Sequence, residues 1–340
     1  SIIPNPQSPI PNPQSPIKDT INIILLYFYY ILIFFYNKNL FKIKMSSEKP
    51  KVYFTKTISS EKVVEMFKVL NKPLPGKVAV KVHSGEKGNQ NYLHPEFLRA
   101  MVDYVQGTIV ECNTAYGGAR NTTEKHRELM KEHEWTKYFN VDIMDAEGPD
   151  VTLQIPNGLL IKETYVGKNL LNYDSCLVLS HFKGHGMGGF GGAMKQLSIG
   201  FGSTRGKAYQ HSGGTTDDQG LCWSQKCSDK DFKKSMADAA SAVVKLFKGN
   251  MAFINLMVNI SLDCDCDGSA RPPIMKDIGI LSSTDPVALD KACLDLVYKS
   301  DDEGKKALID RIESLYGAHV IECSEQLGTG KADYELIYVK

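Results

Sequence analysis

The side chains best suited to binding or catalysis gather in one glycine-rich stretch, Cys176 to Gly202. It opens with a short apolar run typical of a buried strand. Glycines then alternate with His181, Lys183, His185 and Lys195 ahead of an expected helix. Glycine lets backbone N–H groups approach a ligand closely, and a helix N-terminus favours an anion. The stretch therefore predicts a site for a small carboxylate or phosphate.

Within this site we assign catalysis to side chains that can carry a proton, with a histidine as general acid or base. The expected catalytic residues are His181, Lys183 and His83. The expected ligand-binding residues are Asn113, Thr114, Gly184, His185, Gly188, Gly189 and Lys195. Two alternatives stay open: His181 and His185 could ligate a metal from a loop, or the glycines could form a purely structural turn. No Gly-Lys-Ser/Thr triplet follows the glycines, which excludes a Walker loop.

A second segment, Asp263 to Asp267, alternates aspartate with cysteine. If it is extended, the two thiols lie on one face and the carboxylates on the other. Thiolates suit zinc or iron, and carboxylates suit magnesium or manganese. The expected ligands of a divalent metal are Asp263, Cys264, Asp265 and Cys266. Two alternatives are a four-cysteine site that adds Cys222 and Cys227, and buried free cysteines beside a solvated acidic turn.

The elements that must position these residues follow an alternating pattern from Lys51 onward, which predicts an α/β fold with a mostly parallel sheet flanked by helices. His83, Asn113, His181 and Asp263 each follow an expected strand. Because the carboxyl ends of such strands form the ligand crevice, we expect these residues to converge.

Three local expectations accompany this pattern. A small β-hairpin insertion is expected from 152–155 and 159–163, turned by Pro156-Asn157-Gly158. Single helices are expected over 122–138 and 232–247, and Ser60 is the expected N-cap of the first helix. The polar segment from Ser203 to Asp229 is expected to be a long surface loop.

Composition limits the possible partners. The chain has 340 residues, of which 42% are hydrophobic, and a formal net charge of +1. That charge provides no field to gather nucleic acid or an anionic membrane, so neither partner is expected. The eight cysteines are scattered, which favours a reducing compartment such as the cytoplasm over a disulfide scaffold.

Residues 1–44 differ from the remainder. A direct repeat, PNPQSPI, precedes an apolar run from Ile21 to Tyr36, and Met45 begins a polar segment. The run is shorter than the roughly 20 residues that a spanning helix needs, and its flanks do not match a secretory signal. We expect 1–44 to be a non-native or disordered leader and 45–340 to be a single α/β domain. The alternative is a membrane anchor through Ile21–Tyr36.

Six segments share an order along the chain that is typical of one family. They are KVHSGEKGN (81–89), NTAYGGAR (113–120), LSHFKGHGMGGFGGAMKQLSIG (179–200), KAYQHS (207–212), FINLMVNISLDCDC (253–266) and DIGILSSTDPVALDKACLDLV (277–297). Together they resemble the domain of unknown function 362 family, often labelled iron-sulfur center protein. Many relatives carry a ferredoxin-like insert just after the segment that matches KAYQHS. Here only Cys222 and Cys227 lie in that region, too few for a cubane cluster, so such a cluster is not expected.

The resemblance implies an α/β body without an established reaction. Combined with the residues above, it leads us to expect an enzyme that binds a small anionic ligand, with or without help from a divalent metal. The alternative is an iron-sulfur or metal-binding redox protein that uses the Cys264/Cys266 segment. A scaffold that binds only a protein partner also stays open.

Overall fold

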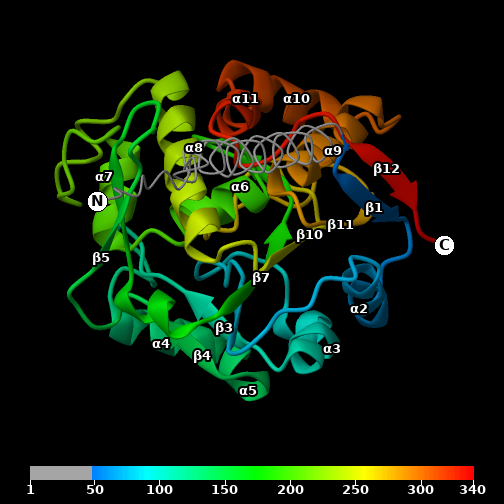
Figure 1. The fold of residues 1–340 in the computed structure, drawn as a ribbon, viewed down its shortest axis with the longest axis horizontal. Coiled ribbons are helices and arrows are strands. Elements are labelled where there is room, and N and C mark those ends of the chain that lie inside the picture. Colours follow the sequence, from blue (N-terminus) through cyan, green and yellow to red (C-terminus); the bar gives the residue numbers. More distant parts are fainter. Residues whose placement is uncertain (1–47) are drawn as a thin grey trace, which may run out of the picture. The chain divides into compact units, whose positions relative to one another are not determined.

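The computed structural model describes residues 48–340, and Lys49–Lys340 forms one compact unit (Figure 1). The predictions made for residues 1–44, including the leader and the anchor through Ile21–Tyr36, lie outside the described residues. Among the helices of residues 48–340, none is long and apolar enough to cross a membrane.

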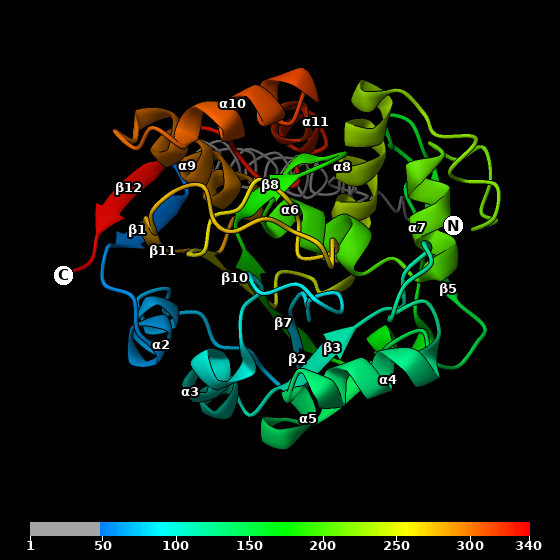
Figure 2. The same ribbon diagram turned by 180° about the vertical axis from the view of Figure 1, so that it is seen from behind.

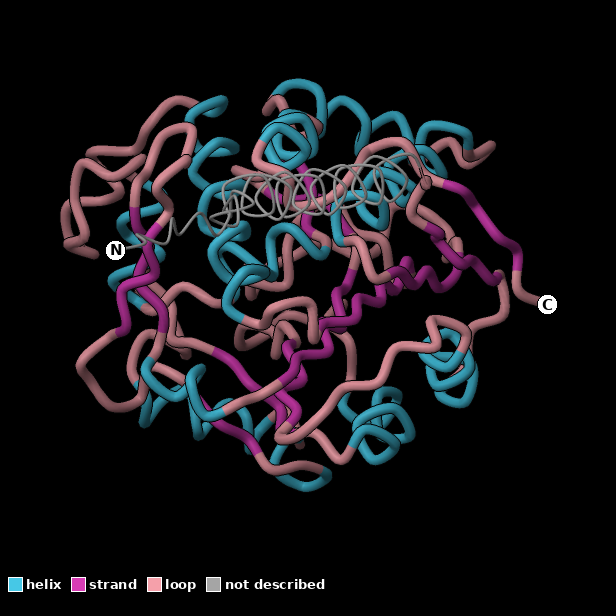
Figure 3. Tube along the Cα trace, viewed as in Figure 1, coloured by secondary structure: helices cyan, strands magenta, loops and turns pink. Residues whose placement is uncertain are grey.

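An eight-stranded sheet runs through the centre of the unit (Figure 3). From one edge to the other its strands are β12 (Glu335–Tyr338), β1 (Lys51–Thr55), β11 (Gly279–Ser283), β10 (Met251–Met257), β7 (Ser175–His181), β2 (Val78–Lys81), β3 (Thr108–Glu111) and β4 (Val141–Ile143). Strand β11 is antiparallel to both of its neighbours, and the other adjacent pairs are parallel. The prediction of a mostly parallel sheet is confirmed.

The central strand β7 shows why the sheet is buried on both faces. Cys176 and Val178 pack into one apolar cluster, and Leu177 and Leu179 pack into another. Successive side chains of a strand point to opposite faces, so a continuous apolar run supplies two cores at once. The sheet is therefore a middle layer between two layers of helices.

Helices cover each face of the sheet (Figures 1 and 2). One layer contains α2 (Ser60–Lys68), α3 (Pro95–Val105), α4 (Thr123–Glu132) and α5 (Trp135–Tyr138). The other contains α6 (Ala193–Lys195), α8 (Asp229–Leu246), α9 (Pro286–Lys299), α10 (Lys305–Ser314) and α11 (His319–Gln326). Helix α7 (Thr204–His211) and a π-helical turn, Gln196–Gly200, lie beside the second layer.

Two small antiparallel hairpins complete the fold: β5 (Val151–Gln154) with β6 (Glu163–Val166), and β8 (Lys183–His185) with β9 (Gly189–Gly191). The first was predicted, but its second strand begins at Glu163 rather than spanning 159–163. The Asp238 carboxylate of α8 accepts the backbone N–H groups of Leu159, Leu160 and Ile161, so these groups cannot join a ladder. The second hairpin was not predicted.

Several helix expectations need correction. The expected helix 122–138 is divided into α4 and α5, because Glu134 adopts a left-handed backbone with φ 61°. Helix α8 begins at Asp229, ahead of the expected 232, since Ser228 caps it. The N-cap of α2 is Ser59, whose side chain accepts the Lys62 N–H, and not Ser60. The expected loop from Ser203 opens with helix α7.

Candidate active site

A cavity of about 260 Å³ lies at the carboxyl ends of β2 and β3. Its lining includes His83 after β2, Thr114 after β3, His185 on β8 and Asp263 in the loop after β10. Of the four residues expected to converge, His83 and Asp263 line the cavity, and Asn113 and His181 do not. The π-helical turn and α7 contribute further walls.

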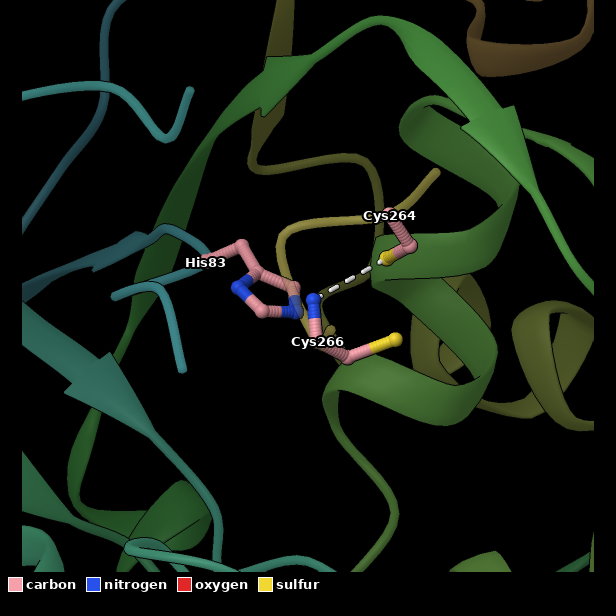
Figure 4. Close-up of side chains that lie close together, drawn as sticks. All are labelled: His83, Cys264 and Cys266. Carbon is pink, nitrogen blue, oxygen red and sulfur yellow. Dashed lines mark hydrogen bonds between the residues drawn. The ribbon is translucent and has the colours of Figure 1, made fainter. Parts of the chain in front are cut away.

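The two thiols of the loop after β10 both line this cavity. Figure 4 shows the His83 ring directed toward Cys264 and Cys266. One ligand atom from each of these three side chains lies within 4.8 Å of the others. The group combines one imidazole and two sulfurs, which are ligands that zinc accepts.

Hydrogen-bond donors surround the Cys264 sulfur. Lys195 Nζ donates to Sγ at 3.1 Å, and the Cys266 backbone N–H donates to it at 3.4 Å. Burial alone would raise the pKa of Cys264, but the Cys266 thiol and the Lys195 ammonium outweigh it and lower that pKa well below its usual range. The pKa of Cys266 is raised, chiefly because its thiol donates to Cys264. The Lys195 ammonium therefore favours the thiolate form at Cys264 rather than at Cys266.

Backbone N–H groups hold the rings of His83 and His185, two of the histidines that line the cavity. His185 Nδ1 accepts the backbone N–H groups of Met187 at 3.1 Å and Gly188 at 2.7 Å, and His83 Nδ1 accepts that of Gly85 at 3.2 Å. A neutral ring that accepts at Nδ1 carries its proton on Nε2. Burial, followed by nearby cations, lowers the pKa of His83 to about 4, and the pKa of His185 is lowered for the same reasons. Both rings are thus neutral near pH 7.

Asp265 lies between the two cysteines but points into the protein interior. It accepts from His181 Nδ1 at 2.9 Å and from Lys183 Nζ at 2.6 Å, and all three side chains are buried. His181 Nε2 donates to the Val258 carbonyl at 2.7 Å. Burial would raise the pKa of Asp265, but His181 and Lys183 reverse the effect and hold it far below its usual range. His181 and Lys183 therefore fix the loop from behind.

The same loop is tied to the loop after β2. The Glu86 N–H donates to the Asp265 carbonyl at 2.7 Å, and Asn89 Nδ2 donates to the Asp267 carbonyl at 2.8 Å. Tyr116 Oη donates to the Cys266 carbonyl at 3.3 Å. These bonds hold the backbone that carries the two thiols in one position.

A cluster of paired charges forms another part of the lining. Lys81 Nζ lies 2.5 Å from Glu111 Oε2, and Arg120 lies 3.3 Å from Glu86 and 3.5 Å from Glu111. Burial lowers the pKa of Lys81, while the same cations outweigh burial and hold the pKa of Glu111 well below its usual range. These charges are largely balanced within the protein.

Helix α7 contributes two side chains of which, within the described residues, one lacks an ion pair and the other has a ring nitrogen without a hydrogen-bond partner. Lys207 is buried and its ammonium donates to the Gly202 carbonyl at 2.5 Å, with no ion pair among residues 48–340. His211 is 6% exposed, and its Nδ1 has no hydrogen-bond partner in the described chain. Its ring stacks on Phe232 at 4.7 Å and lies 4.9 Å from the Trp223 ring. Lys207, His211 and Trp223 all line the cavity.

The helix N-terminus after the glycines is occupied by the protein itself. The Asp290 carboxylate accepts the N–H groups of Ala193 at 2.8 Å and Met194 at 2.9 Å. A Cβ on Gly192 would lie 2.5 Å from Asp290 Oδ1, so this glycine admits an internal carboxylate. The expectation that these amides hold a ligand is corrected here, because Asp290 already fills the position.

The predicted site residues therefore divide into two groups. Those that line the cavity are His83, Thr114, His185, Lys195, Asp263, Cys264 and Cys266. Those that lie outside its lining are His181, Lys183, Asp265, Asn113, Gly184, Gly188 and Gly189. Asn113 instead bonds Thr123 and His126, and Gly184 and Gly189 pack closely against the backbone at Leu262 and Gly317. The mixed thiolate and carboxylate ligand set is not assembled, because Asp265 faces away.

Sequence reasoning missed Lys81, Glu111, Arg120, Lys207 and His211. Lys207 and His211 are four residues apart, which places them on one face of a helix. The expectation of a loop after Ser203 concealed that spacing. The matching segments NTAYGGAR and KAYQHS contain Arg120, Lys207 and His211 and were the available signal.

The four-cysteine alternative is not formed in the described chain. Cys222 lies in a small apolar cluster with Ala115 and Ala208, and the Cys227 thiol donates to the His211 carbonyl at 3.4 Å. Neither residue joins the group of His83, Cys264 and Cys266.

Comparisons with known proteins give a family match and likenesses to solved structures. A family model described as "Domain of unknown function (DUF362)" matches residues 78–295. Among solved structures, the lactate racemase apoprotein of Thermoanaerobacterium thermosaccharolyticum is 14% identical with a TM-score of 0.40, covering 72% of this chain and 56% of that protein. A protein of Thermotoga maritima is 11% identical with a TM-score of 0.37, covering 79% of this chain and 59% of that protein. No curated protein matches the chain.

Proposed function

Because this chain belongs to the domain of unknown function 362 family, whose description assigns no reaction, we propose its function from the cavity: it binds a small anionic molecule and acts on it through the Cys264 thiolate. The observation that carries this proposal is the Lys195 ammonium, which donates to Cys264 Sγ at 3.1 Å in the lining of the cavity. A thiolate is the reactive form of cysteine, and adjacent cations are what stabilise it at neutral pH.

The residues around Cys264 suggest how such a reaction would proceed. The thiolate would add to an electrophilic carbon, such as the carbonyl carbon of a bound ligand, and form a carbon–sulfur bond. The carbonyl oxygen would then gain negative charge. Lys195 Nζ, released from the thiolate, and the Nε2–H groups of His83 and His185 would donate to that oxygen. His181 would act through Asp265 as a positioning residue.

Alkylation of Cys264 with iodoacetamide tests the proposal. We expect peptide mass spectrometry to show Cys264 modified at pH values well below 8.5, about the pKa of an ordinary thiol. Cys222, which is buried among apolar residues with a raised pKa, is the internal control and should react only at higher pH. A pH profile for Cys264 that matches that of Cys222 would rule out the thiolate.

A second function is favoured by one observation, the compact group of His83, Cys264 and Cys266. Three such ligands with the cavity beside them resemble a catalytic zinc centre that keeps an open position. Ligation through His83 Nε2 would require a proton on Nδ1, and the Gly85 N–H now points at that atom. The loop after β2 would therefore have to change when a metal binds.

Metal analysis separates the two functions. The protein is purified anaerobically, and its zinc, iron and nickel content is measured together with a visible spectrum. A stoichiometric metal that is lost in His83→Ala but kept in the surface variant His94→Ala would favour the metal centre. Metal-free protein with a reactive Cys264 supports the thiolate enzyme.

A further inference from the structure

Resting on the proposed function, we infer that the ligand is a small monocarboxylate whose carboxyl group lies against Lys207 and His211 while its reactive carbon lies beside Cys264. Lys207 and His211 are separated by one turn of α7, and both line the same cavity as the thiolate. The cavity volume of about 260 Å³ suits a molecule of a few carbon atoms.

The pairing of charges in the cavity assigns the ligand's carboxyl group to the position beside Lys207 and His211. Lys195 faces the Cys264 thiolate, Lys81 faces Glu111, and Arg120 faces Glu86 and Glu111. Lys207 is the lining lysine whose ammonium is satisfied by a carbonyl and by no ion pair in the described residues. A buried ammonium without a counter-charge is costly, so an incoming anion that pairs with it gains free energy.

The single positive charge indicates a monoanion. Burial, together with His185 and Lys195, lowers the pKa of His211 to about 3, so its ring is neutral and donates one hydrogen bond. One ammonium and one neutral donor match a carboxylate better than a phosphate dianion. The α6 amides that would otherwise hold a phosphate are taken by Asp290.

Part of the cavity lining is apolar or aromatic. Met187, Ile199 and Trp223 line the cavity, and Trp223 is fixed by its Nε1–H, which donates to the Ala115 carbonyl at 3.1 Å. The unpartnered Nδ1 of His211 is a further sign of a binding position, because buried polar atoms are normally hydrogen-bonded. A ligand with a short apolar body therefore fits between the carboxyl end and the thiolate.

A series of bromoalkanoic acids of two to five carbons, each with its neutral amide, tests this arrangement. The Cys264 thiolate displaces bromide: the carbon–sulfur bond forms, the carbon–bromine bond breaks, and bromide leaves with the electron pair. We expect one chain length to alkylate Cys264 at least about tenfold faster as the acid than as the amide, given the strength of a charge-assisted hydrogen bond. The rate should saturate with acid concentration.

Variants on α7 locate the subsite. Lys207→Gln should abolish the preference for acid over amide, Lys207→Arg should restore part of it, and His211→Phe, which keeps the stacking, should reduce it. Arg205→Gln is the matched control, because Arg205 is on the same helix but pairs with the exposed Asp217. A preference that survives Lys207→Gln, or is lost equally in Arg205→Gln, overturns the subsite.

Two outcomes keep this inference distinct from the proposed function. If Cys264 reacts with neither the acids nor the amides, the thiolate itself fails. If it reacts with both equally at every chain length, the thiolate stands and the carboxylate subsite fails. Thermal-shift measurements on Cys264→Ser add a readout without chemistry: butyrate should stabilise the protein, and stabilisation by inorganic phosphate alone would overturn the assignment to a carboxylate.

Discussion

Asp265 and Cys264 are consecutive residues, yet their side chains enter different surroundings. Asp265 is fully buried against His181 and Lys183, which both donate to it. Cys264 meets Lys195 and two histidines at the wall of a cavity. The first environment has no room for a ligand and serves to fix the loop. The second leaves a reactive sulfur beside open space, so adjacent positions divide the work of stability and chemistry.

The largest expected effect comes from removing the carboxylate of Asp265. Asp265→Ala leaves His181 and Lys183 buried without their counter-charge, and we expect a loss of about 3–5 kcal/mol in the free energy of unfolding. Chemical denaturation measures it. Asp267→Ala is the control, because Asp267 accepts from Ser269 at the exposed end of the same loop. Equal losses in the two variants would contradict the comparison.

The acid sensitivity of the fold should depend on the same carboxylate. The folded-state pKa of Asp265 is lowered, so its contribution is complete above the unfolded pKa of about 3.9 and is lost as pH falls toward the folded value. Unfolding measured from pH 5 to pH 2 should show a steeper loss of stability in the wild type than in Asp265→Asn. Parallel curves would show that Asp265 does not titrate as expected.

The environment of Cys264 is tested by removing the ammonium group of Lys195. Lys195→Met should raise the pKa of the Cys264 thiol by about 1–3 units, the usual effect of one close opposite charge. The pH at which alkylation reaches half of its maximal rate would rise by the same amount. The pH dependence of the iodoacetamide rate measures the shift. Lys233→Met, which removes an ammonium bonded to the Met187 carbonyl, controls for loss of positive charge nearby.

A smaller difference in stability is expected between alanine substitutions at two glycines of the stretch from Cys176 to Gly202. Gly192→Ala would place a Cβ 2.5 Å from the Asp290 carboxylate and should cost about 1–3 kcal/mol of unfolding free energy through overpacking. Gly186, which lines the cavity, has nothing within 4 Å of the position that an alanine Cβ would take, so Gly186→Ala should leave stability nearly unchanged. Thermal unfolding compares the two. A costly Gly186→Ala would be inconsistent with open space beside it.

The smallest expected effect concerns the second thiol. Cys266→Ser keeps a hydrogen-bond donor next to Cys264, so the alkylation rate of Cys264 should change only a few-fold. Cys266→Ala removes the donor and should raise the pKa of Cys264. If serine and alanine variants react alike, the shared proton has no role in holding the thiolate.

The convergence of strand ends could be predicted from the sequence because it depends only on parallel strands. His83 and Cys264 are far apart in the chain, yet each follows a strand of the same sheet and both reach the cavity. The direction of each side chain could not be predicted, since it depends on loop geometry. The alternation of thiols and Asp265 was predicted, but the buried donors that Asp265 meets, His181 and Lys183, were not.

The glycine-rich stretch shows a different limit. Glycines accommodate a close ligand and a close backbone equally well, and sequence does not distinguish the two. Here Gly184 and Gly189 approach backbone, and Gly192 approaches the Asp290 carboxylate. The site on α7 was missed for another reason. The polar segment was interpreted as a loop, and the four-residue spacing of Lys207 and His211 indicates a shared face only in a helix.

The hydrogen bonds that join the loop after β2 to the loop after β10 also affect how the cavity opens. Glu86 and Asn89 donate to the backbone of the second loop, and the Gly85 N–H of the first loop fixes His83. Neither loop can therefore move away without breaking bonds to the other. Segments linked in this way unfold locally as one cooperative unit, so backbone amides in both loops should exchange with solvent at a common rate. A bound ligand that contacts only one of them would slow exchange in both.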